Sequence, residues 1–61
     1  MDYLTPAEEA ALSTAMQQAH QTAFREAIAA KLSISEALEL GRAASYEVFY
    51  ARFPEQRPVE G

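Results

Sequence analysis

Hydrophobic and small residues recur every four positions through the first half of the chain. Four residues turn a helix by slightly more than one full turn, so each series stays on one side of a helix and drifts slowly around it. The pattern predicts a helix over residues 6–31. The small series is Ala7, Ala11, Ala15, Ala19, Ala23 and Ala27, and the larger series is Leu12, Met16, His20, Phe24, Ile28 and Leu32.

Two signals for a helix start divide the chain. Thr5 is followed by a proline and then by Glu8, which is the capping-box spacing with proline at the first helical position. Ser33 and Glu36 repeat the spacing, with Leu32 just outside it. We therefore expect a second helix over 34–53 that ends before Pro54. The alternative is one long helix that continues through residue 33.

The second predicted helix has a face of small and aliphatic residues. On a helical wheel, Ile34, Ala37, Leu40, Gly41, Ala44, Val48 and Ala51 share one side. Glycine inside a helix costs about 1 kcal/mol relative to alanine, so Gly41 indicates a close approach between backbones. We expect the alanine series of the first helix to pack here. The predicted helix-packing residues are Ala15, Ala19, Ala23, Ala27, Gly41, Ala44 and Val48.

The expected fold is all-α. A short connection makes consecutive helices antiparallel neighbours, so the two helices form a hairpin. Residues 1–53 are predicted to be one helical domain. Residues 54–61 contain two prolines and a glycine among few apolar groups, which is typical of a flexible tail.

Four aromatic residues form a second stripe on the later helix. Tyr46, Phe49, Tyr50 and Phe53 have the spacing i, i+3, i+4 and i+7, and on the wheel they lie nearly opposite the small face. One helix of a hairpin does not bury two opposite faces, so these four residues are predicted to bind another chain, with Phe49 nearest the core. The alternative is that Tyr3, Leu4 and the tail fold over the stripe.

Length and composition favour self-association. A chain of 61 residues buries a small share of its surface on folding, and proteins of this size use disulfides, a metal or a partner chain for added stability. The chain has no cysteine, and one histidine leaves little for a metal site. The sequence therefore predicts a homodimer with a four-helix arrangement.

The charge pattern argues against nucleic-acid binding. Nine acidic residues outnumber five basic ones, and the basic residues are scattered. Nucleic-acid binding needs Lys and Arg gathered on one face. A helix-turn-helix protein would have just Arg42 and Arg52 on its reading helix, and no strand precedes Thr5 as a ribbon-helix-helix protein requires. A small DNA-binding transcriptional or antitoxin-like regulator remains the alternative function.

No catalytic, cofactor or metal site is expected. His20 lies in the large series, and its helical neighbours complete no nucleophile and base pair. Glu8, Glu9, Glu36 and Glu39 occupy first helical turns, where capping and the helix dipole account for them. The Glu-x-x-His motif of di-metal bundles is absent.

The predicted function is a small interaction module without enzymatic activity. It would act as a homodimeric adaptor, regulator or inhibitor of a larger protein. No run of apolar residues reaches the length of a membrane span, and the first residues lack the basic start and apolar segment of a signal peptide. The expected location is the cytoplasm.

Overall fold

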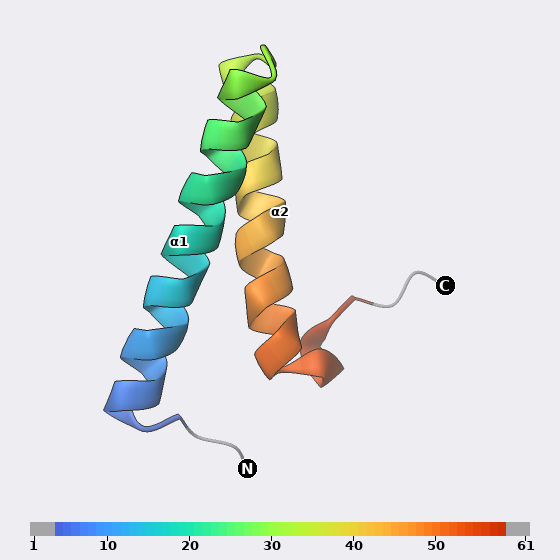
Figure 1. Cartoon of the computed structure of the whole chain (residues 1–61). Helices are drawn as coiled ribbons and strands as arrows, with labels where there is room; N and C mark the ends of the chain where they lie inside the picture. The colour runs from blue at the N-terminus through green and yellow to red at the C-terminus, as the bar shows by residue number, and fades with distance from the viewer. Residues whose placement is uncertain (1–3, 59–61) are drawn as a thin grey trace.

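The computed structural model describes residues 4–58, and these residues form a hairpin of two helices (Figure 1). Helix α1 is Pro6–Ala29, helix α2 is Ile34–Arg52, and a short 3-10 turn, η1, is Pro54–Gln56. No strand occurs among residues 4–58. The predicted all-α fold with two helices is confirmed, and the alternative of one continuous helix is wrong.

Both helices begin with the capping box that the sequence predicts. At α1, the backbone N–H of Glu8 donates to the Thr5 hydroxyl over 3.1 Å, and the backbone N–H of Thr5 donates to the Glu8 carboxylate over 3.0 Å. At α2, Ser33 and Glu36 form the same reciprocal pair over 3.1 and 3.3 Å. Each box satisfies two backbone groups near the start of its helix.

Helix α1 ends two residues earlier than predicted. Lys31 has φ of 70°, in the left-handed region. Its N–H donates to the carbonyl of Ile28, and the N–H of Leu32 donates to the carbonyl of Ala27, both over 3.0 Å. This is a Schellman motif, which closes the helix and turns the chain toward Ser33. The sequence prediction missed it because lysine occupies a position where glycine is the usual signal.

The helices are closest near their connection and diverge toward the two termini, as Figure 1 shows. Ala37 is fully buried and Ala27 is 4 % exposed, and both lie close to the connection with Gly41, which is also buried. The small side chains of Ala27 and Ala37 let the helices lie close together here. At Gly41 the missing side chain instead leaves room for the His20 ring of α1, so the predicted approach of the α1 backbone and alanine series to Gly41 is wrong. The hairpin therefore has a closed end near residues 30–33 and an open end near the termini.

One ridge of α2 explains the divergence. It consists of residues four positions apart. The three nearer the closed end have small side chains or none, and the two nearer the open end are phenylalanines. The ridge drifts around α2, and the face of α2 that meets α1 drifts with it. Phe49 and Phe53 therefore still lie on the side of α1. The small members let the helices lie close together, and the two phenylalanines fill a wider space between them. The α2 ridge is Ala37, Gly41, Ser45, Phe49 and Phe53.

The resulting molecule is a flat layer. Its extents are 43 × 34 × 13 Å, and the smallest is close to the diameter of one helix, about 10–12 Å. The radius of gyration is 13.4 Å, compared with about 10.5 Å for a compact domain of this length. Domains normally enclose a core between two packed layers, so this chain alone leaves most of its apolar side chains partly exposed.

Candidate interaction surface

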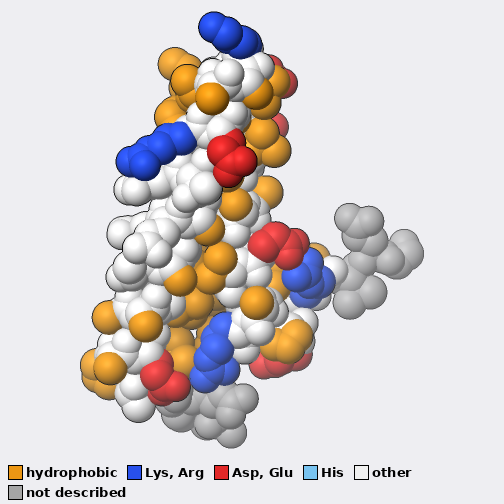
Figure 2. All heavy atoms as spheres, in the orientation of Figure 1, with side chains coloured by type: hydrophobic (Ala, Val, Ile, Leu, Met, Phe, Trp, Pro, Cys, Tyr) orange, Lys and Arg blue, Asp and Glu red, His pale blue; other side chains and the backbone are white. Residues whose placement is uncertain are grey.

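An open groove lies between the helices at the open end. Its volume is about 820 Å³, and residues from both helices and from the segment before α1 line it. On the face drawn in Figure 2, hydrophobic side chains follow the line between the two helices. The apolar residues that line the groove are Leu4, Leu12, Met16, Phe49 and Phe53, and the polar ones are Glu9, Ser13, Gln17, His20, Gln21 and Ser45.

The groove continues toward the closed end as a shallower hollow. This hollow has a volume of about 210 Å³ and shares His20 and Gln21 with the groove. Phe24, Arg25 and Leu38 complete it. The larger series of α1 therefore contributes Leu12, Met16, His20 and Phe24 to one continuous surface, which we call the groove face. The sequence pattern places this series beside the alanines but gives no sign that it forms an open surface.

His20 is packed against Gly41 at the middle of the groove face. A Cβ atom added at Gly41 would lie 2.7 Å from His20 Nδ1 and 3.1 Å from His20 Cγ. The imidazole therefore occupies the space that a side chain at position 41 would need. The ring also stacks on Phe24, with 6.4 Å between ring centroids and 13° between planes. His20 has a packing role here that its sequence neighbours did not indicate.

The structure divides the four predicted interface aromatics between two surfaces. Phe49 and Phe53 line the groove and are half-buried, and their ring centroids are 5.1 Å apart. Tyr46 is 48 % exposed and lies 6.3 Å from the ring of Tyr50. The wheel placed all four on one side because it assumes a fixed packing face, whereas the face of α2 that meets α1 drifts toward Phe49 and Phe53.

Arg57 connects the tail to this tyrosine pair. Its guanidinium donates two hydrogen bonds to the carboxylate of Glu47, over 2.9 and 2.7 Å, and lies 5.1 Å from the ring centroid of Tyr50. The hydrogen bond from Arg57 lowers the pKa of Glu47 below its ordinary value. Of the alternative arrangement, in which Tyr3, Leu4 and the tail fold over the stripe, the structure shows that Arg57 lies over Tyr50 and that Leu4 lines the same groove as Phe49 and Phe53, while Tyr3 lies outside the described residues. The flexibility predicted for residues 54–61 stays a prediction.

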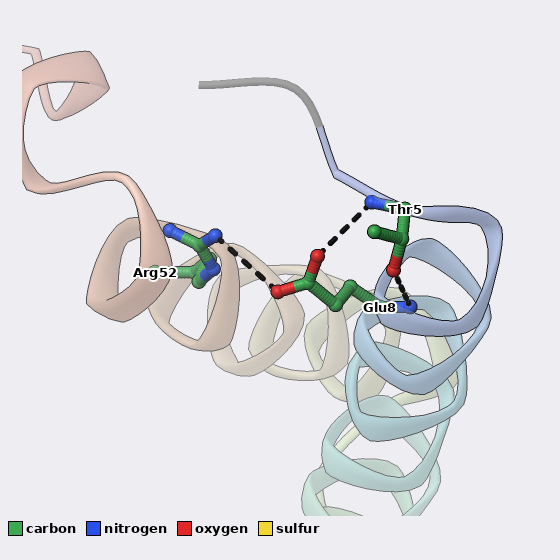
Figure 3. A network of polar contacts seen from close by, with 3 residues as sticks. All are labelled: Thr5, Glu8 and Arg52. Carbon is green, nitrogen blue, oxygen red and sulfur yellow. Dashed lines mark hydrogen bonds and ion pairs between the residues drawn. The ribbon is translucent and has the colours of Figure 1, made fainter.

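A polar contact joins the two helices at the open end of the groove. Arg52 at the end of α2 lies 3.9 Å from the carboxylate of Glu8 at the start of α1, as Figure 3 shows. The pKa of Glu8 is lowered, first by the hydrogen bond from the Thr5 backbone, then by the Thr5 hydroxyl, and least by Arg52. Both charged side chains are exposed, so the ion pair contributes little to stability.

The predicted packing residues are buried to different extents along the hairpin. Ala27 and Gly41 are buried at the closed end, while Ala15, Ala19 and Ala23 are half-buried. Ala7 and Ala11, earlier in the alanine series, are exposed. On α2, Ala44 and Val48 are half-buried. This gradient follows from the divergence of the helices, which the sequence pattern did not predict.

The polar side chains of the groove face are a histidine, amides, hydroxyls and one carboxylate. Among residues 4–58, no group of three His, Asp or Glu side chains is arranged to hold a metal ion. His20 makes no hydrogen bond or ion pair to another side chain within that range, and the other groove-lining groups are amides, Ser13, Ser45 and Glu9.

Neither described helix is both long enough and apolar enough to cross a membrane. Comparison with protein-family models, curated proteins and solved structures finds no match for this chain.

Proposed function

We propose that this chain is a small, non-enzymatic protein–protein interaction module that acts as a homodimer. In this role it would serve as an adaptor, regulator or inhibitor of a larger protein. The proposal rests on one observation, which is how little of its apolar surface the hairpin buries. Just Ala27, Ala37 and Gly41 are buried among residues 4–58.

The exposed area of the chain is larger than that of a compact monomer of the same mass. The chain exposes 4891 Å², whereas a compact monomer of 6.7 kDa exposes about 3,900 Å² by the general relation between surface and mass. The difference is about 1,000 Å². A stable interface between two proteins buries about 800 Å² on each partner. Association of two chains would remove an area of this size and add the second layer that one hairpin lacks.

The composition of the exposed surface supports a protein partner. Half-buried aromatic rings and methionine are enriched at protein interfaces, and Met16, Phe49, Tyr50 and Phe53 are all half-buried. Tyrosine adds a hydroxyl that stays in contact with water while the ring is covered. The tyrosine pair, in which Tyr46 is exposed and Tyr50 is half-buried, is a candidate surface for a partner of the assembled dimer.

A double substitution tests the proposal. Phe49→Ala with Tyr50→Ala removes one ring from each aromatic surface, and we expect a lower assembly mass by light scattering while far-UV circular dichroism keeps most of the helical signal. Because an interface aromatic often contributes more than 2 kcal/mol, the dissociation constant should rise by more than about tenfold.

The matched control is Leu40→Ala, which shortens a side chain that is 47 % exposed and does not line the groove. This variant should keep the wild-type mass. The proposal would be wrong if the double variant kept both its mass and every binding partner of the wild type.

A further inference from the structure

Besides the small and the larger series, α1 has a third series of residues four positions apart, which runs along the groove face beside the larger series. Its members all contact the groove or the adjoining hollow, and all are exposed. The series is Glu9, Ser13, Gln17, Gln21 and Arg25, which we call the polar ridge. It has an acidic residue at one end, a basic residue at the other, and Gln17 at its centre.

We propose that the second copy of this chain docks on the groove face with α1 antiparallel to α1 and the twofold axis beside Gln17. This inference rests on the proposed function and assigns its dimer surface. About a twofold axis of this kind, each residue faces the residue equally far on the other side of Gln17. Glu9 of each copy faces Arg25 of the other, Ser13 faces Gln21, and the two Gln17 side chains meet.

The charges at the ends of the polar ridge favour this orientation. Glu9 and Arg25 are 16 positions apart, or about 24 Å along the helix, and neither forms an ion pair within residues 4–58. A parallel pairing in the same register would place Glu9 beside Glu9 and Arg25 beside Arg25. The antiparallel pairing forms two opposite-charge contacts instead, one at each end, and it requires a shallow helix crossing of about 20°.

The shape of the hairpin favours the same arrangement. With the second copy inverted, its closed end lies over the open end of the first. Its Phe24 then lies level with the turn between Glu9 and Leu12, where the groove is lined by Phe49 and Phe53. Each wide groove therefore receives an aromatic ring from the partner, and Leu12 and Met16 of both copies become covered. A stable dimer buries about 800 Å² per chain, within the about 1,000 Å² of excess surface.

Charge reversal tests the register. Glu9→Arg alone sets two arginines against each other at both ends of the dimer, and Arg25→Glu alone does the same with two glutamates. Each single variant should dimerise about tenfold more weakly at low salt. An equimolar mixture of the two should form a heterodimer of near wild-type affinity, because both contacts are again Arg with Glu. Glu26→Arg, on the opposite side of α1, is the control and should dimerise as the wild type does.

A single cysteine tests the position of the axis. The chain has no cysteine, so Gln17→Cys introduces the one thiol present. Two thiols beside a twofold axis lie close enough to bridge, and we expect mild oxidation to convert most of this variant to a disulfide-linked dimer. Gln18→Cys, exposed but absent from the groove lining, is the matched control and should remain mostly unlinked.

The outcomes separate this inference from the function on which it rests. If the wild type is a dimer but both charge variants keep its affinity and Gln17→Cys links no faster than Gln18→Cys, the groove-face register is wrong and the homodimer stands. If the wild type is a folded monomer, both proposals are wrong. Restored affinity in the mixture together with selective linkage at position 17 supports the register.

Discussion

Lys31 has a left-handed backbone conformation that costs a residue with a side chain about 1–2 kcal/mol. Glycine adopts it without this cost but loses more conformational entropy on folding. We therefore expect Lys31→Gly to raise the free energy of unfolding by about 0.5–1 kcal/mol, measured by urea denaturation at one fixed protein concentration. Lys31→Ala keeps the steric cost and is the control. A gain for alanine equal to that for glycine would show that the lysine charge, and not φ, is responsible.

At Gly41, in contrast, we expect that replacing glycine with alanine lowers the free energy of unfolding, although the position lies inside a helix. Alanine in place of glycine normally stabilises a helix by about 1 kcal/mol. Here the new Cβ would lie 2.7 Å from the His20 ring, and overpacking of this kind costs about 1–3 kcal/mol. We expect Gly41→Ala to lower the free energy of unfolding by about 1 kcal/mol in the wild type.

Removing the imidazole should reverse the sign of that effect. In a His20→Ala background, Gly41→Ala has no ring to displace, so the helix propensity of alanine should raise stability by about 1 kcal/mol. Thermal or urea unfolding of the four proteins in this cycle measures the coupling. A stabilising effect of Gly41→Ala in both backgrounds would contradict the close contact between α1 and α2.

Among the helical elements, the start of α1 should be sensitive to acid. The backbone N–H of Thr5 binds the ionised Glu8 carboxylate and is the main cause of its lowered pKa in the folded chain. A lowered folded-state pKa contributes stability that is complete above the ordinary pKa of 4.5 and is lost as the pH falls through the lower, folded value. The stability of the wild type should therefore decrease over this acidic range.

Glu8→Gln isolates this contribution. The amide oxygen still accepts a hydrogen bond but does not titrate, so the variant should be less stable than the wild type near neutral pH and should approach it in acid. Circular dichroism at fixed protein concentration, with urea denaturation at each pH, measures both curves. If the difference in unfolding free energy between the two proteins did not change with pH, the capping carboxylate would have no role in the acid sensitivity.

Three of the four helix ends could be predicted from the sequence, because residues close in the chain determine them. Thr5 with Glu8 and Ser33 with Glu36 predicted both helix starts, and Pro54 predicted the end of α2 to within one residue. The end of α1 was missed because its Schellman motif uses Lys31. Backbone hydrogen bonds within the connection form this motif, and position 31 lacks the glycine that would have predicted it.

The arrangement of the surfaces was less accessible, because it depends on how two helices diverge. A wheel for one straight helix put Phe53 with Tyr46 and Tyr50, away from α1. The structure puts Phe53 in the groove, since the α2 ridge turns toward α1 as it approaches the open end. The pairing of Arg57 with Glu47 also depends on the turn at Pro54–Gln56, which brings residues ten positions apart into contact.

The whole molecule is one flat layer of two helices, whereas a stable domain normally encloses its core between two layers. The two-helix layer is 13 Å thick, and it leaves four large apolar side chains lining an open groove instead of a core. These are Leu12, Met16, Phe49 and Phe53. Folding free energies are small differences between large terms, so an apolar surface of this size decides whether such a short chain is stable alone. A second copy on the groove face would enclose these side chains between two layers.

The mass of the wild-type protein in solution shows whether two copies of the chain associate. Light scattering coupled to size exclusion, over a dilution series through the micromolar range, gives the mass while circular dichroism reports folding. We predict a particle of twice the 6.7 kDa chain mass that loses helical structure or stability as it dissociates on dilution. A particle of 6.7 kDa that stays stably folded throughout the micromolar range would show that the homodimer is wrong.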